Sequence, residues 1–111
     1  MFLDEPLKNK VMAVQIKEEY GILKVVGVLN SETARLTIDF VNTLLETKER
    51  VLVSLEGVLS IDKMAAKAIE KLYTNAVKNN KVLSIFGKQN SNISEVMQAT
   101  NTNYIFSWDR E

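Results

Sequence analysis

The first part of the chain alternates between apolar and polar positions. From residue 12 the larger apolar residues Met12, Val14 and Ile16 alternate with smaller or polar ones, which is typical of a strand with one buried face. Residues 18–21 predict a hairpin turn, because Gly21 can adopt a positive φ. The β-branched and apolar run 22–28 then predicts a second strand, antiparallel to the first.

Two longer segments show helical spacing of their apolar residues. The first, residues 31–48, follows Asn30 and Ser31, which are both good helix caps. The second, residues 63–79, ends at a pair of asparagines that can adopt the left-handed conformation found at helix C-termini. In the second helix the apolar face consists of Ala65, Ala68, Ile69, Leu72 and Ala76.

Leu36 and Phe40 lie off the apolar stripe of the first helix. They indicate either a wide buried face with partly covered flanks or an exposed apolar patch for a partner. The first interpretation is favoured, because single apolar side chains are common on protein surfaces.

Two further strands and a third helix complete the pattern. The nearly continuous apolar run 51–55 predicts a strand covered on both faces, and residues 56–60 are expected to form a loop that connects it to the second helix. Residues 81–87 predict another strand. Asn92 with Glu95 resembles a capping box at the start of a short helix. The order β-β-α-β-α-β-α predicts an α/β domain with a small mixed sheet over residues 11–111, after an N-terminal arm over residues 1–10.

Composition narrows the chemistry that this domain can perform. The chain has 111 residues, 14 Lys and Arg against 14 Asp and Glu, and neither His nor Cys. Imidazole and thiolate catalysis, their metal sites and disulfides are therefore excluded. The balanced charge does not favour nucleic acid or an anionic membrane. The start of the sequence lacks the pattern of a signal peptide, so we expect a cytoplasmic protein.

The segment 51–62, VLVSLEGVLSID, resembles the signature of the STAS domain, which sulfate transporters share with bacterial anti-sigma-factor antagonists. The shared features are a buried strand, a Gly-Val-type turn and an Asp that opens the next helix. Residues 27–30 resemble the family's Gly-x-Leu-Asp segment, residues 80–87 its fourth strand, and residues 93–106 its closing helix and final aromatic residue. The resemblance spans about residues 10–107 and implies the same α/β fold.

The sequence departs from this family at its regulatory position. In the anti-sigma-factor antagonists that this segment resembles, the turn reads Asp-Ser-Ser/Thr-Gly. Its second hydroxyl residue is phosphorylated by the anti-sigma kinase. Here Asp62 is kept, but Lys63, Met64 and Ala65 follow it, so Met64 stands at the acceptor position and cannot be phosphorylated. Asn30 replaces the acidic residue of the earlier segment. Whether Ser60 or Ser31 substitutes as an acceptor stays open.

We therefore expect a non-enzymatic interaction protein that binds a protein partner such as an anti-sigma kinase. The alternatives are a STAS subunit that docks on the ATPase of a lipid-trafficking ABC transporter, and a small enzyme that uses a carboxylate or Lys. No cofactor, metal, nucleic acid or membrane insertion is expected, and a homodimer stays open. The expected partner-binding residues are Asn30, Ser31, Asp62, Lys63, Met64 and Lys67.

Lys63, Lys67 and Lys71 recur every four residues and so share one face of their helix. This row of positive charge is either a solvated face or a surface for an acidic partner. Asp62 itself has a structural explanation, because an Asp before a helix caps the N–H groups of the first turn.

Overall fold

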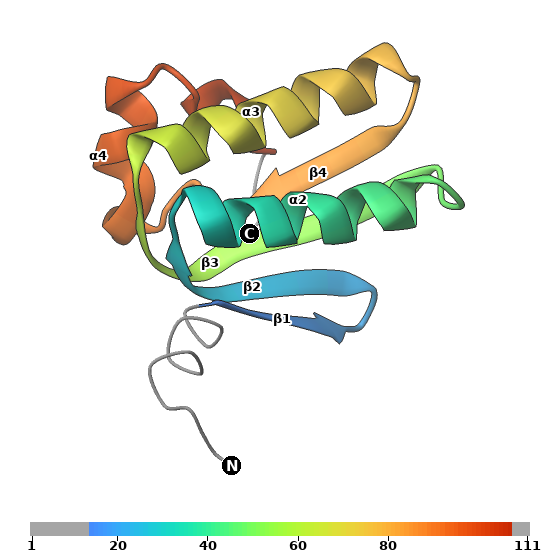
Figure 1. Cartoon of the computed structure of the whole chain (residues 1–111), viewed down its shortest axis with the longest axis horizontal. Helices are drawn as coiled ribbons and strands as arrows, with labels where there is room; N and C mark the ends of the chain where they lie inside the picture. The colour runs from blue at the N-terminus through green and yellow to red at the C-terminus, as the bar shows by residue number, and fades with distance from the viewer. Residues whose placement is uncertain (1–13, 108–111) are drawn as a thin grey trace.

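The computed structural model describes residues 14–107, which form a four-stranded sheet with three helices and a short 3-10 helix (Figure 1). The elements are β1 (Val14–Glu19), β2 (Ile22–Leu29), α2 (Ser31–Leu45), β3 (Arg50–Ile61), α3 (Lys63–Lys78), β4 (Val82–Phe86), α4 (Ser91–Ala99) and η1 (Asn103–Ile105). The predicted order β-β-α-β-α-β-α and the predicted α/β class are confirmed. The predicted arm at residues 1–10 lies outside the described residues.

The strands follow their sequence order across the sheet, β1-β2-β3-β4. β1 pairs with β2 in antiparallel fashion, whereas β2–β3 and β3–β4 are parallel pairs. Each parallel pair is joined by a helix, and α2 and α3 pack against each other over the sheet (Figure 1). The carboxyl ends of β2, β3 and β4 therefore meet at one edge of the sheet, which we call the carboxyl edge.

A two-residue turn joins β1 to β2. Both Tyr20, with φ 54°, and Gly21, with φ 81°, are in the left-handed region, as a type I′ hairpin turn requires. The sequence predicted the positive φ at Gly21, but it did not predict a Tyr in the same conformation. The side chain of Tyr20 is fully exposed.

The sheet buries one of its faces against the helices. Along β3 the side chains of Val51, Val53 and Leu55 are buried, whereas those of Leu52 and Ser54 between them are only half-buried. The second face of this strand is therefore less completely covered than predicted. This alternation is hidden in the sequence, because Leu52 on the less covered face is also apolar.

β3 is also longer than predicted, and it continues to Ile61 through residues that were expected to form a loop. Two irregularities let it do so: the pairing with β2 shifts by one residue between Lys24 and Val26, and again between Gly27 and Val28. In each case β3 contains one residue more than β2 over the same length. These register shifts are β-bulges, which leave the extra residues of β3 without a partner on β2.

The first two helices begin where predicted, at Ser31 and Lys63. α2 ends at Leu45, three residues before the predicted end, where a run of polar residues leads to β3. At the end of α3, Asn80 has a φ of 60°, and the N–H of Lys81 donates to the carbonyl of Ala76 over 2.9 Å. This is the Schellman arrangement, and it confirms the helix end predicted from the paired asparagines.

Leu36 and Phe40 on α2 are 51% and 46% exposed. A wide buried face that includes them is therefore excluded. The alternative, an exposed apolar patch for a partner, stays a prediction.

Candidate functional site

The N-termini of α2 and α3 lie next to each other at the carboxyl edge. Leu29, the last residue of β2, is paired with Ile61, the last residue of β3. Asp62, the residue after β3, donates its N–H to the carbonyl of Leu29 over 3.0 Å. The two segments that were predicted separately from the sequence, Asn30–Ser31 and Asp62–Met64, are thereby brought to one place.

Asn30 is the N-cap of α2. Its Oδ1 atom accepts hydrogen bonds from the N–H groups of Glu32 and Thr33, at 3.0 and 2.9 Å. In return, the Thr33 hydroxyl accepts the N–H of Asn30 at 2.9 Å and donates to the carbonyl of Val28 at 2.8 Å. The Oδ1 atom of Asn30 therefore closes this turn and holds the end of β2 and the start of α2 together.

Asp62 is the N-cap of α3. Its Oδ1 atom accepts the N–H of Ala65 at 2.8 Å, which satisfies one of the free donors of the first turn. This contact confirms the structural role expected from the sequence. It also fixes the orientation of the first helical turn, which carries Lys63 and Met64.

Ser31, Lys63 and Met64 are exposed at this edge, and the Met64 side chain is 70% exposed. Leu59, three residues before Asp62, is 63% exposed. Two large apolar side chains are therefore turned to solvent close to Asp62 in the chain. Leu59 was not identified in the sequence, because it was taken as part of a connecting loop.

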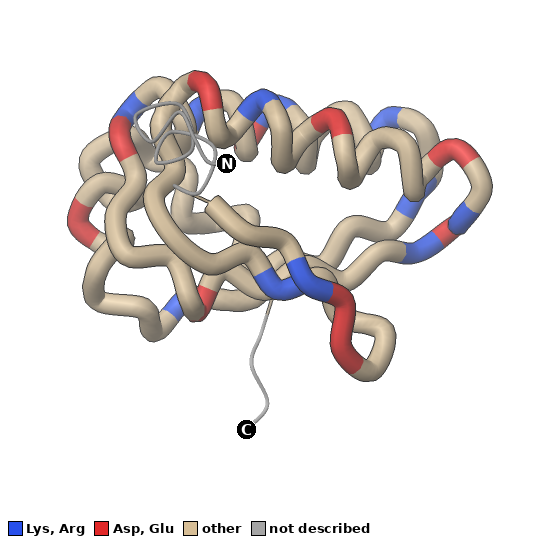
Figure 2. The backbone as a smooth tube through the Cα atoms, turned by 60° about the horizontal axis from the view of Figure 1, so that its bottom comes forward, with Lys and Arg blue, Asp and Glu red and all other residues tan. Residues whose placement is uncertain are grey.

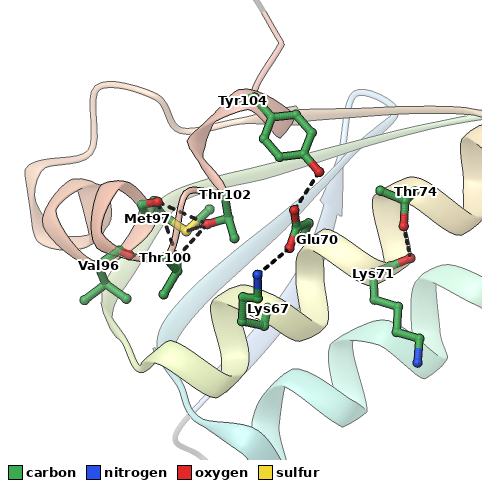
Figure 3. A network of polar contacts seen from close by, with 9 residues as sticks. All are labelled: Lys67, Glu70, Lys71, Thr74, Val96, Met97, Thr100, Thr102 and Tyr104. Carbon is green, nitrogen blue, oxygen red and sulfur yellow. Dashed lines mark hydrogen bonds and ion pairs between the residues drawn. The ribbon is translucent and has the colours of Figure 1, made fainter.

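Lys67 lies one turn further along α3 and is engaged within the molecule. Its Nζ atom is 3.2 Å from Oε1 of Glu70, and Oε2 of Glu70 accepts the hydroxyl of Tyr104 at 2.6 Å (Figure 3). The ring of Tyr104 meets that of Tyr73 edge to face, with 6.4 Å between centroids. Lys67 is thus paired with the same carboxylate that binds η1 to α3. Its charge is therefore less available to a partner than that of an unpaired lysine.

The same contact shifts two pKa values in opposite directions. The hydroxyl of Tyr104, and after it the ammonium of Lys67, lowers the pKa of Glu70 below its usual value. The pKa of Tyr104 is raised, first because its hydroxyl donates to Glu70. Both shifts favour the neutral phenol and the charged carboxylate, which is the pair that makes the hydrogen bond.

Charge elsewhere on the molecule is mixed. Basic and acidic residues alternate over the strands and helices without a large region of one sign (Figure 2). Lys63 and Lys71 form no ion pair within residues 14–107, so the positive row on α3 is only partly neutralised by Glu70. In the same range no three acidic side chains lie close enough together to hold a metal ion.

A third helix N-terminus reaches the carboxyl edge, and its cap was assigned wrongly from the sequence. The N-cap of α4 is Asn90, not Asn92, and its Oδ1 atom accepts the N–H of Asn92 at 2.9 Å. Asn92 and Glu95 have the spacing of a capping box, but both residues lie inside α4. A cap asparagine directly before Ser91 was the signal that could have placed the helix start.

Comparisons with known proteins support the fold but identify no family. No family model matches the sequence, and no curated protein matches it. A solved structure of Mglu is similar to 67% of this chain, with 19% sequence identity and a TM-score of 0.56. The chain corresponds to 19% of the length of Mglu. Within the described part of the chain, no helix combines the length and the apolar character needed to cross a membrane.

Proposed function

We propose that this chain is a non-enzymatic, cytoplasmic STAS-like interaction module that binds a protein partner through the carboxyl edge, with Met64 at the centre of the contact. The partner that the family resemblance favours is an anti-sigma kinase. The observation that carries the proposal is the position of Met64: it is a large apolar side chain, 70% exposed, in the first turn of α3 directly after the Asp62 cap.

Two features of this turn are unfavourable for folding alone. Met64 leaves a thioether in solvent, and Lys63 places a positive charge near the positive end of a helix dipole. Local choices that cost stability without a compensating contact are expected where a surface is used for binding. A flexible, polarizable Met is well suited to a protein contact, because it adapts to the shape of its partner.

The substitution of Met for a hydroxyl residue implies constitutive binding. A phosphate would add about −1.5 to −2 charges to an interface formed by neutral side chains. Met64 cannot accept a phosphate, so the module would stay bound to its kinase in the presence of ATP. Lys63 and Lys71, which have no ion pair within residues 14–107, would favour an acidic surface on that partner.

A retention experiment with the cognate anti-sigma kinase tests this proposal. The immobilised chain is compared with Met64→Asp and with Val77→Asp, which adds the same charge at a 55% exposed apolar position at the other end of α3. We expect wild type and Val77→Asp to retain the kinase and Met64→Asp to lose it.

Retention by all three proteins would show that the carboxyl edge is not the binding surface. Failure of the wild type to retain the kinase, with capture of a transporter ATPase from native cytosol, would favour the alternative function in an ABC transporter. Phosphate transfer to Ser31 or Ser60 from labelled ATP would contradict constitutive binding, because the switch would then have moved to another hydroxyl.

A further inference from the structure

The last part of β3 lacks a neighbouring strand on one side. β4 pairs with β3 only from Arg50 to Ser54, so residues 55–61 have no strand partner on the β4 side within the described part of the chain. This is also where the two bulges interrupt the pairing with β2. Backbone carbonyls in such a segment need another donor, because a buried unpaired carbonyl is costly.

Asn90 supplies that donor. Its Nδ2 atom lies 2.9 Å from the carbonyl oxygen of Leu55 and 2.8 Å from that of Val58, with the carbonyl of Glu56 at 3.4 Å. The carbonyls of Leu55 and Glu56 lie within the first bulge, and that of Val58 lies where the second begins. One side-chain amide therefore takes the place of the missing strand at this point of β3.

The same side chain also caps α4, since its Oδ1 atom accepts the N–H of Asn92. The backbone N–H of Asn90 donates to the carbonyl of Gly87 over 2.9 Å, which closes the turn after β4. Gly87 has a φ of +138°, and an added Cβ there would lie 3.2 Å from Cβ of Leu55. The turn is thus pressed directly against the bulged part of β3.

We propose that Asn90 is a positioning residue that fixes the bulged end of β3 and thereby the conformation of Leu59 to Met64 at the carboxyl edge. The importance of that edge rests on the proposed function, but the positioning itself does not. Asn90 acts through the carbonyls of Leu55 and Val58. Any change of its amide therefore alters the backbone that leads into Asp62 and α3.

Replacement of the amide by a carboxylate is the sharpest test. Asn90→Asp keeps the size of the side chain and its ability to cap α4, but at neutral pH it places a negative charge against three carbonyl oxygens. A protonated carboxyl group can again donate one hydrogen bond. The carbonyl oxygens repel the charged form and should raise the pKa of this carboxyl above the ordinary Asp value of about 4, so the defect should be largest at pH 7 and should diminish as the pH falls to 4.

The measurement is hydrogen exchange of the amides of residues 56–63, with the protection factor compared at pH 7 and pH 4. Asn92→Asp is the matched control, because it adds the same charge two residues away at an exposed position. At pH 7 we expect these amides to exchange about tenfold faster in Asn90→Asp than in the control, from the loss of the hydrogen bonds. The difference should narrow at pH 4.

Asn90→Ser provides a second variant that keeps a good cap but is too short to reach β3. It should raise exchange in residues 56–63 at both pH values while α4 stays protected. Unchanged protection of residues 56–63 in either variant would overturn the proposal, as would a uniform loss over the whole sheet at both pH values. Neither result depends on a partner, so the outcome is independent of the kinase experiment.

Discussion

The two sides of α3 differ in what their residues contact. On one side, Ile69 and Leu72 are buried in the core. On the other, Lys63 and Met64 of the first turn are exposed at the carboxyl edge, and Glu70 two turns later binds Tyr104 of η1. The buried side stabilises the fold, whereas the first turn of the exposed side costs some stability and offers a surface. Substitutions on the two sides should therefore separate folding from binding.

The largest effect on stability is expected on the buried side. Ile69 is 2% exposed, so Ile69→Ala should lower the free energy of unfolding by about 2–5 kcal/mol, through lost burial and a cavity. Met64→Ala on the exposed side should change it by no more than about 0.5 kcal/mol. Urea unfolding of both variants checks this contrast, and equal losses would show that Met64 also belongs to the core.

The N-cap of α3, Asp62, should have an intermediate effect on the free energy of unfolding. Asp62→Ala removes the acceptor for the N–H of Ala65 and should cost about 1 kcal/mol. Asp62→Asn keeps an equivalent acceptor, so chemical denaturation should place it within a few tenths of a kcal/mol of wild type. A similar cost for both substitutions would indicate that the charge of Asp62, rather than its capping bond, stabilises the fold.

The contact between Tyr104 and Glu70 should give a smaller effect that depends on pH. The lowered pKa of Glu70 means that its contribution is present above its ordinary pKa and is lost as the pH falls through the folded value. The raised pKa of Tyr104 means that its contribution is present below its ordinary pKa and is lost as the pH rises through the folded value.

The thermal midpoint of Tyr104→Phe should therefore lie below that of wild type at neutral pH. The difference should shrink in acid below about pH 4 and in alkali above about pH 10, around the ordinary pKa values of Glu and Tyr. Thermal melts across this range provide the test. A constant difference at all pH values would mean that the hydroxyl acts through packing and not through its bond to Glu70.

The smallest effect on stability belongs to the position at the centre of the proposed surface. Met64→Asp replaces an exposed apolar side chain by an acidic one near a helix N-terminus, so the free energy of unfolding should stay within about 0.5 kcal/mol of wild type or rise slightly. Circular dichroism melts check that any loss of binding by this variant is not a loss of folding.

Much of this architecture can be predicted from the sequence, because local patterns determine most of it. Apolar periodicity and cap residues located the strands and the starts of α2 and α3, and parallel pairing brought Asn30 and Asp62 to one edge. The extension of β3 through its bulges could not be predicted, since residues 56–60 resemble a loop when the pairing with β2 is unknown.

The contacts that were missed join residues far apart in the chain. Asn90 binds carbonyls 32 to 35 residues away, and Tyr104 binds Glu70 over 34 residues. Neither side chain belongs to a local sequence pattern that predicts such a distant partner.

Phosphate transfer from the cognate anti-sigma kinase tests the central claim most directly. With labelled ATP, wild type should stay bound to the kinase and unlabelled, whereas Met64→Ser should accept label at the restored hydroxyl and be released. A matched Val77→Ser variant should behave as wild type. Label on the wild-type chain, or a bound but unlabelled Met64→Ser variant, would contradict the claim that Met64 replaces the acceptor of a binding surface.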